Sequence, residues 1–167
     1  MAGLRALTAR TYMQAGTGIL VNKGTAYTDP QNVWTTIFTI ANGLVLVTNL
    51  VGVRTVVQAG GASFIQLRHS VGTTALCAAT TLITADAVAT IYTITGNPSD
   101  GVISGASGAP IQGGMHGSPA GLSSEMFGVI MMAGNIQYTC TAAAGTGSTR
   151  FILTYIPLDP AAIVTAA

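Results

Sequence analysis

The side chains that could do acid–base or metal chemistry are few in this sequence, and they stand far apart. His69 lies in a strand-like run, on the face that also carries Ile65 and Leu67, which is typical of a structural histidine. His116 lies in the glycine-rich stretch "GGMHGSP", with no His, Cys or acidic residue at ligand spacing. The acidic residues are scattered along the chain: Asp29, Asp86, Asp100, Glu125 and Asp159. Because there is also no G-x-S-x-G nucleophile motif, we expect no catalytic site, no metal site and no cofactor, and therefore not an enzyme.

Two other features could carry chemistry. The stretch "AAAGTGST" at 142–149 has the small residues of a phosphate loop, but it lacks the lysine, and a strand-like run follows where a helix should stand. We therefore predict a hairpin turn there. Cys77 and Cys140 each lie in a strand-like run, which favours two buried thiols that pack as small hydrophobic side chains; a mutual disulfide is the alternative.

The composition limits the possible functions. The 167 residues are 49% hydrophobic and only 7% charged, with a net charge of +1. An ordinary globular domain has roughly 25% charged residues, and a nucleic-acid-binding domain is usually basic, so we expect no direct nucleic-acid partner. The longest apolar runs, at 44–53 and 126–134, are interrupted or too short for a membrane-spanning helix, and the first residues show no signal peptide. We expect a protein made in the cytoplasm whose apolar surface is hidden against other subunits.

The elements that must position these side chains read as strands throughout. The run "NIQYTCT" alternates apolar and polar residues, and "TRFILTYI" carries apolar residues on both of its faces, so we expect both of those faces to be covered. The pair Asn42-Gly43 predicts a hairpin between the runs at 34–40 and 44–50. The second run continues as a long strand that contains Gly52, where we predict a bend or a bulge. The remaining strand candidates lie at 63–70, 73–83, 87–95 and 128–134.

Two segments differ from this pattern. Residues 1–30 carry three cationic side chains and no acid before Asp29, which predicts an extended arm that lies on a partner, with one short strand at 18–22. Residues 96–124 are rich in Gly, Ser and Pro and predict a long loop that becomes ordered against a partner. Residues 31–167 then form a single domain. The fold class we expect is all-β: a jelly-roll-like β-sandwich or barrel, with the arm and the loop as extensions.

The last 34 residues, "GNIQYTCTAAAGTGSTRFILTYIPLDPAAIVTAA", resemble the C-terminus of head decoration, or cement, proteins of tailed bacteriophages. The runs "LVTNLVGVRTVVQAG" and "LCAATTLITADAVATIYTITGNPSDG" are similar to strands of the same family, so the resemblance covers residues 37–104 and 126–167. It implies a structural protein on the capsid exterior of a virion, a homotrimer whose partner is the major capsid protein. The alternative we keep open is a fibre-tip or carbohydrate-binding, receptor-binding β module.

The candidate contact residues follow from these expectations. Arg5, Arg10 and Tyr12 lie in the arm, which we expect to bind the shell or a neighbouring trimer. Trp34 is the only tryptophan, and its apolar neighbours favour a place in the core or in an interface. Pro157 and Pro160 should end the last long strand near Ile156. Beyond them, the uncharged tail at 161–167 should be ordered through Ile163 and Val164, on its own subunit or on the next.

Overall fold

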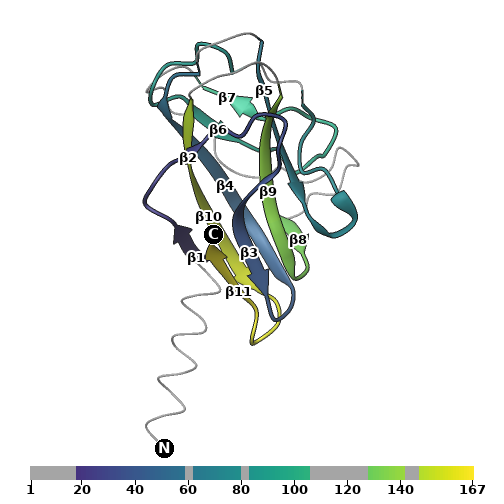
Figure 1. Ribbon diagram of the computed structural model, residues 1–167. Coiled ribbons are helices and arrows are strands. Elements are labelled where there is room, and N and C mark those ends of the chain that lie inside the picture. The colour runs from purple at the N-terminus through teal and green to yellow at the C-terminus, as the bar shows by residue number, and fades with distance from the viewer. Residues whose placement is uncertain (1–17, 59–61, 80–82, 106–127, 142–146) are drawn as a thin grey trace, which may run out of the picture.

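The computed structural model describes residues 18–58, 62–79, 83–105, 128–141 and 147–167 and confirms an all-β fold. Two antiparallel sheets pack face to face as a β-sandwich (Figure 1). The larger sheet has the order β1-β10-β4-β6-β7, with β2 beside β10 and β8 beside β4; the smaller has the order β11-β3-β9-β5. The strands are β1 (Ile19–Asn22), β2 (Tyr27–Thr28), β3 (Thr35–Ala41), β4 (Val45–Val56), β5 (Phe64–His69), β6 (Ile91–Thr93), β7 (Ile103–Ser104), β8 (Val129–Met131), β9 (Gly134–Thr141), β10 (Ser148–Pro157) and β11 (Ile163–Ala166). A jelly-roll winding of these strands stays a prediction.

The core lies between the sheets and is built by the alternation of side chains along the strands, clearest on β5 and β10. On β9 the buried face carries Ile136, Tyr138 and Cys140, and on β10 it carries Phe151, Leu153 and Tyr155, as the sequence predicts. The rings of Tyr138 and Phe151 meet with their centroids 4.7 Å apart, and Tyr27 packs against both. These aromatic contacts join the two sheets at the centre of the sandwich.

Two predicted hairpins are wrong, because the strands on either side belong to different sheets. Asn42 and Gly43 do adopt the positive φ angles of a tight turn, 60° and 138°, but β3 pairs with β9 and β11 whereas β4 pairs with β10, β6 and β8. Likewise β9, which ends at Thr141, lies in the small sheet, whereas β10, which begins at Ser148, lies in the large one. In both cases the chain crosses from one sheet to the other, and the two successive strands do not pair. Burial of an apolar face on each strand favours this crossing, since it places the two faces against each other.

The middle of the chain contains less strand than predicted. In the described part of 73–83 only Ala75 forms a bridge, to Arg68, and β6 covers three residues of the predicted strand at 87–95. Gly52 makes no bulge: the register shifts of the β4–β10 ladder fall near its two ends. Gly52 is instead a point of close packing, because a Cβ there would lie 3.1 Å from the ring of Phe151.

Residues 18–30, the described part of the expected arm, belong to the sandwich. β1 and β2 both pair with β10, which agrees with the strand expected at 18–22. The hydroxyl of Tyr27 lies 2.9 Å from the carbonyl oxygens of Ile37 and Ala167, so this segment also contacts the small sheet and the tail. The domain therefore begins by Gly18 and not at residue 31. Residues 1–17 lie outside the described part of the chain, as do residues 106–124 of the predicted long loop.

The tail is ordered on its own subunit, as β11 paired with β3. β10 ends at Pro157, one residue beyond the predicted end, and the turn that follows is held by the carboxylate of Asp159, which accepts a 2.7 Å hydrogen bond from the backbone N–H of Leu44. Within the tail, Val164 is 4% exposed and points into the sandwich, whereas Ile163 is 46% exposed on the outside.

Placing an aspartate at these two adjacent positions should have opposite consequences. Val164→Asp should lower the free energy of unfolding by about 3 kcal/mol, because an unpaired charge enters an apolar site. Ile163→Asp should change it by no more than about 0.5 kcal/mol, as surface substitutions usually do. Denaturant titration of both variants and the parent measures the difference. Equal effects would show that the tail does not pack as β11 in solution.

Candidate interaction surface

The outer face of the small sheet has the polar character expected of a face in water. Thr39 on β3 donates a 3.1 Å hydrogen bond to the side-chain oxygen of Asn135 on β9. Arg68 on β5 donates a 2.9 Å hydrogen bond to the side-chain oxygen of Gln137 on β9, whose amide nitrogen lies 3.4 Å from the hydroxyl of Thr36. These cross-strand pairs satisfy one another and leave a polar surface.

Trp34 belongs to this polar face and not to the core. It is half-buried, just before β3, and the guanidinium carbon of Arg68 lies 4.1 Å from the centre of its ring. This stacking is a cation–π contact that covers one side of the indole. The prediction of a core position for Trp34 is therefore wrong. A register shift between Thr36 and Phe38 reverses the alternation of β3, so Trp34 lies on the outer side although Phe38 and Ile40 point inward. A role of Trp34 in an interface stays a prediction.

The outer face of the large sheet is apolar, in contrast to that of the small sheet. Strand register aligns its side chains into rows across neighbouring strands. Ile156 on β10 pairs with Leu46 on β4, which pairs with Ile130 on β8. Farther along the same strands, Ile152 pairs with Val51. Each of these residues alternates with a buried, inward-pointing neighbour, so all five point outward.

Exposed apolar residues extend this face at its edges. Leu20 on β1 is 66% exposed and Ile130 is 61% exposed, and Met132, just after β8, is 54% exposed. Leu44 and Leu158 are also exposed and are joined by a 2.9 Å backbone hydrogen bond at the same end of the sheet. We call the outward residues of the large sheet the apolar outer face, in which Leu46 is buried at 6% exposure and the others are half-buried or exposed: Leu20, Leu44, Leu46, Val51, Val53, Ile91, Ile130, Met132, Ile152, Ile156 and Leu158.

Few charges interrupt the apolar outer face. In the register of β10 and β4, Arg150 stands beside Val53, and it is the one charged side chain that the described strands of the large sheet direct outward. Thr154 and Asn49 form a polar row between the apolar rows. Exposing a sheet face of this composition to water is unfavourable. Such a face is typical of a surface that binds another protein.

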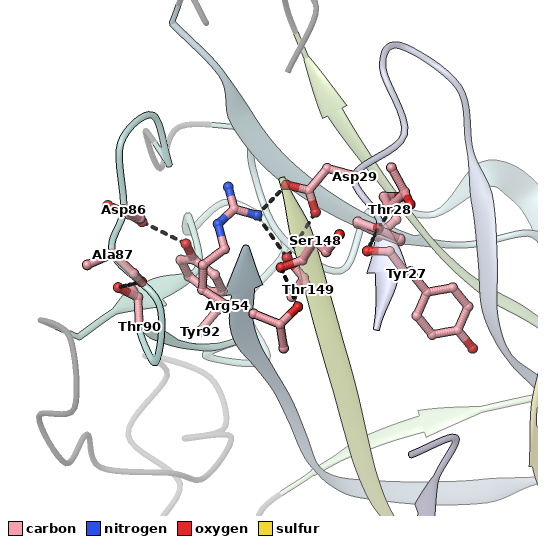
Figure 2. Close-up of polar contacts among 12 residues, drawn as sticks. Tyr27, Thr28, Asp29, Arg54, Asp86, Ala87, Thr90, Tyr92, Ser148 and Thr149 are labelled. Atoms are coloured by element: carbon pink, nitrogen blue, oxygen red, sulfur yellow. Dashed lines mark hydrogen bonds and ion pairs between the residues drawn. The ribbon is translucent and has the colours of Figure 1, made fainter. Parts of the chain in front are cut away.

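A buried polar cluster fixes one end of the large sheet to the segment before β3 (Figure 2). Arg54 of β4 forms an ion pair with Asp29, and both side chains are fully buried. The hydroxyl of Thr149 on β10 lies 3.0 Å from the same guanidinium nitrogen and 3.0 Å from the other carboxylate oxygen of Asp29. On the other side of Arg54, Figure 2 shows Tyr92, whose hydroxyl donates a 2.7 Å hydrogen bond to Asp86.

Burial and charge act in opposite directions on this cluster. Burial raises the pKa of the Asp29 carboxyl above its usual range, although Arg54 and Thr149 both favour its charged form. The guanidinium is incompletely paired: among the described residues, Nε and Nη2 of Arg54 have no hydrogen-bond partner. The cluster therefore holds the fold together at a desolvation cost, and its atoms are sealed from solvent. This arrangement suits a structural role and not a catalytic one.

The sequence-predicted residues have the following positions. His69 is buried, with Nε2 3.1 Å from the carbonyl oxygen of Met132, which confirms a structural histidine. Cys77 and Cys140 are both buried and unbonded to each other, so the disulfide alternative is wrong. Burial raises the pKa of Cys77 to about 11 and that of Cys140 to about 12. The other predicted positions lie outside the described residues: Arg5, Arg10, Tyr12 and His116.

Sequence reasoning missed the apolar outer face as a whole and the Arg54–Asp29 pair. Only the two-faced apolar pattern of β10 pointed to the face.

Within the described residues, no group of three or more His, Cys, Asp or Glu side chains is placed to hold a metal ion. No helix in that part of the chain has the length and apolar character to cross a membrane. Comparison with protein-family models, with curated proteins and with solved structures gave no match.

Proposed function

We propose that the protein is a structural component of a tailed-phage virion, a decoration protein that binds the outside of the capsid as a homotrimer and has no enzymatic activity. The observation that carries this proposal is the contrast between the two outer faces of the sandwich, one polar and one apolar. The resemblance of residues 37–104 and 126–167 to decoration proteins supports the same conclusion. The major capsid protein and further copies of the chain are the partners we propose.

The physical logic of such a function fits the composition of the chain. Apolar and threonine-rich faces can be buried between subunits without the desolvation cost of charged groups. A trimer engages three sites of a capsid at once, so weak individual contacts become durable through effective concentration. Binding to the assembled shell and not to free shell subunits then stabilises the shell by mass action.

The self-association part of the proposal is tested on the apolar outer face. Leu20 and Leu44 both point outward and are exposed, so aspartate at these positions should cost the isolated subunit little. The double variant Leu20→Asp, Leu44→Asp should nevertheless weaken the trimer at least 30-fold, roughly 2 kcal/mol, because charges enter a buried interface. Sedimentation at micromolar concentration measures this shift.

A matched control is aspartate at Thr165, an exposed outward position on β11 of the polar sheet. The Thr165→Asp variant should sediment like the parent. If the double variant also sediments like the parent trimer, then the apolar outer face is not the subunit interface. A parent that is monomeric at micromolar concentration would contradict the homotrimer itself.

The virion location is tested directly. Purified virions should contain the protein at a fixed molar ratio to the shell protein, measured by quantitative mass spectrometry across several preparations. Stripping it from the particles should lower the temperature at which the shell opens, and adding it back should restore that temperature. A protein that is absent from virions, or present at a ratio that varies between preparations, would contradict the decoration function.

A receptor-binding or carbohydrate-binding module is the second candidate, and one observation favours it. Trp34, Arg68 and Gln137 lie together on the polar face of the small sheet, where an aromatic ring, a cation and an amide could contact a sugar. A glycan array probed with the parent and with Trp34→Ala distinguishes the two functions. Specific binding that is lost in the variant would support this candidate over decoration.

A further inference from the structure

Among the described strands, β8 lies at an edge of the large sheet. It pairs with β4 through Val45–Val47, and among the described strands no other pairs with it. Proteins usually protect such an edge with Lys, Glu or Pro, but the stretch "GVIMMA" at 128–133 has none of these. Within the described part of the chain, the edge of β8 is therefore open to the addition of an extended segment from another chain.

A pocket lies directly beside this edge. Its volume is about 180 Å³, and its lining residues are His69, Val71, Thr74, Leu76, Val129, Ile130, Met131 and Met132. A cavity of about 150 Å³ with an apolar lining is large enough for a benzene ring, so this pocket can hold one Leu, Met or Tyr side chain. Val71, Ile130 and Met132 are exposed around it. Together, the edge and the pocket fit an extended apolar segment that inserts one side chain.

The chain has such a segment, and its point of attachment is known. Residues 1–17 have the sequence "MAGLRALTARTYMQAGT", which contains Leu4, Leu7, Tyr12 and Met13 and no acidic residue. They join the fold at Gly18, directly before β1. Gly18 lies beside β10, where a Cβ would meet the side chain of Thr154 at 2.6 Å. The segment therefore joins the fold at the β1 edge of the large sheet, the opposite edge from β8.

We propose that residues 1–17 of one copy dock along β8 of the next copy, with one apolar side chain in the pocket. This inference rests on the self-association in the proposed function. In a head-to-tail ring the β1 edge of one copy faces the β8 edge of its neighbour, and an interface of two different edges closes into rings such as a trimer. A segment that leaves Gly18 then meets the neighbour's β8 directly. On its own subunit it would first have to cross three strand spacings, about 14 Å of the apolar outer face.

The length of the segment is sufficient for this contact. Seventeen extended residues span up to about 56 Å, well beyond the length of the three-residue β8. Backbone hydrogen bonds to the free edge would supply affinity, and the pocket would select the register by accepting an apolar side chain and rejecting a charged one. Arg5 and Arg10 would remain outside the pocket.

The experiment uses two full-length forms of the protein that differ in size by an added tag. One carries Leu7→Cys and the other Ile130→Cys, and the pair is co-expressed, purified and mildly oxidised. Cys77 and Cys140 are buried and should not interfere. A disulfide-linked product containing one copy of each size should appear on a non-reducing gel and disappear on reduction. Replacing Ile130→Cys by Thr165→Cys, an exposed position on the other sheet, should reduce this product at least tenfold.

Every outcome decides the proposal. Cysteines at 4, 7, 12 and 13 that all fail to link to Ile130→Cys would overturn the docking. Linkage only between two cysteines placed on the same chain would overturn the second copy as the occupant. The decoration function is tested separately by the virion content of the unsubstituted protein. Failure to link with the virion ratio intact overturns the docking alone, and linkage in a protein that is absent from virions overturns the decoration function alone.

Discussion

Replacing Arg54 by methionine should destabilise the fold by about 3–5 kcal/mol at neutral pH. Arg54 is fully buried, and its guanidinium is the partner of the equally buried Asp29 carboxylate. The substitution leaves that carboxylate in a low-dielectric site, where Thr149 is its one remaining side-chain partner among the described residues. A loss of this size is a large fraction of the total stability of a typical domain, about 5–15 kcal/mol.

The destabilisation caused by Arg54→Met should depend on pH. Without the guanidinium, burial raises the pKa of Asp29 further, so the folded variant binds a proton that the unfolded chain releases. A group whose pKa is raised on folding contributes stability below its unfolded pKa and loses it as the pH rises through the folded one. The Arg54→Met variant should therefore be closest to the parent in acid and farthest from it at neutral pH.

Two further variants separate charge from packing. Asp29→Leu combined with Arg54→Met removes both charges and should recover most of the loss, since a buried pair is often replaceable by apolar side chains. Lys23→Met removes an exposed cation that lies 4.3 Å from the ring of Tyr27 and should cost at most about 1 kcal/mol. Urea titration at pH 5 and pH 7.5 measures all three. A double variant no more stable than Arg54→Met alone would show that the pair is not the source of the loss.

The faces of the long strands could be predicted from the sequence, because alternation is a local property. The inward set of β9 and the inward set of β10 are both correct, and so is the end of β10 near its proline. The same reasoning placed His69 beside Ile65 and Leu67 on the buried face of β5. In each of these strands every second side chain faces the core, so a stretch of a few residues is enough to predict which side chains are buried.

The pairing of the strands could not be predicted in this way. Asn42-Gly43 has the residues of a hairpin turn and the backbone angles of a tight turn, yet β3 and β4 lie in different sheets. Which partner a strand takes depends on contacts with distant segments: β3 pairs with β11, more than a hundred residues farther along the chain. Turn residues fix the local reversal of the chain but not the sheet that the next strand joins.

The buried pair of Arg54 and Asp29 was missed, although the sequence contains one signal of it. Leu50, Gly52 and Arg54 have the same parity on β4, and Leu50 is inward, so Arg54 is a charge at an inward position. A charge at such a position requires a buried partner. The sequence did not identify that partner, because Asp29 lies in a segment predicted to be an arm. The pairing of residues 27–28 with β10 brings the two together.

Raising the pH above 9 should lower the free energy of unfolding more steeply than the loss of surface charge alone would. The four buried thiols and hydroxyls whose pKa values burial raises most are neutral in the folded state: the thiols of Cys77 and Cys140 and the hydroxyls of Tyr92 and Tyr138. The unfolded chain releases these protons near pH 9–10, whereas the folded chain keeps them. Because the unfolded state then binds fewer protons, stability is present below about pH 9 and is lost as the pH rises.

The expected loss of folding stability at high pH is large. At pH 10.5 each thiol should favour unfolding by about 2 kcal/mol and each tyrosine by about 1 kcal/mol, at 1.36 kcal/mol per proton and pH unit. The sum, roughly 6 kcal/mol, is close to the whole stability of a marginal domain. Denaturant titrations at one protein concentration, from pH 8 to pH 10.5, should show the midpoint falling continuously, with no plateau. A midpoint that is constant over this range would contradict the burial of the four groups.

The double variant Cys77→Ala, Cys140→Ala is the matched control. It has a lower stability at pH 8, because two buried side chains become smaller. Its loss between pH 8 and pH 10.5, however, should be about 4 kcal/mol smaller than that of the parent, since two of the four titrating groups are absent. The comparison uses the change with pH within each protein, so the lower starting stability of the variant does not affect it. Parallel losses in both proteins would show that the thiols are already accessible in the folded state.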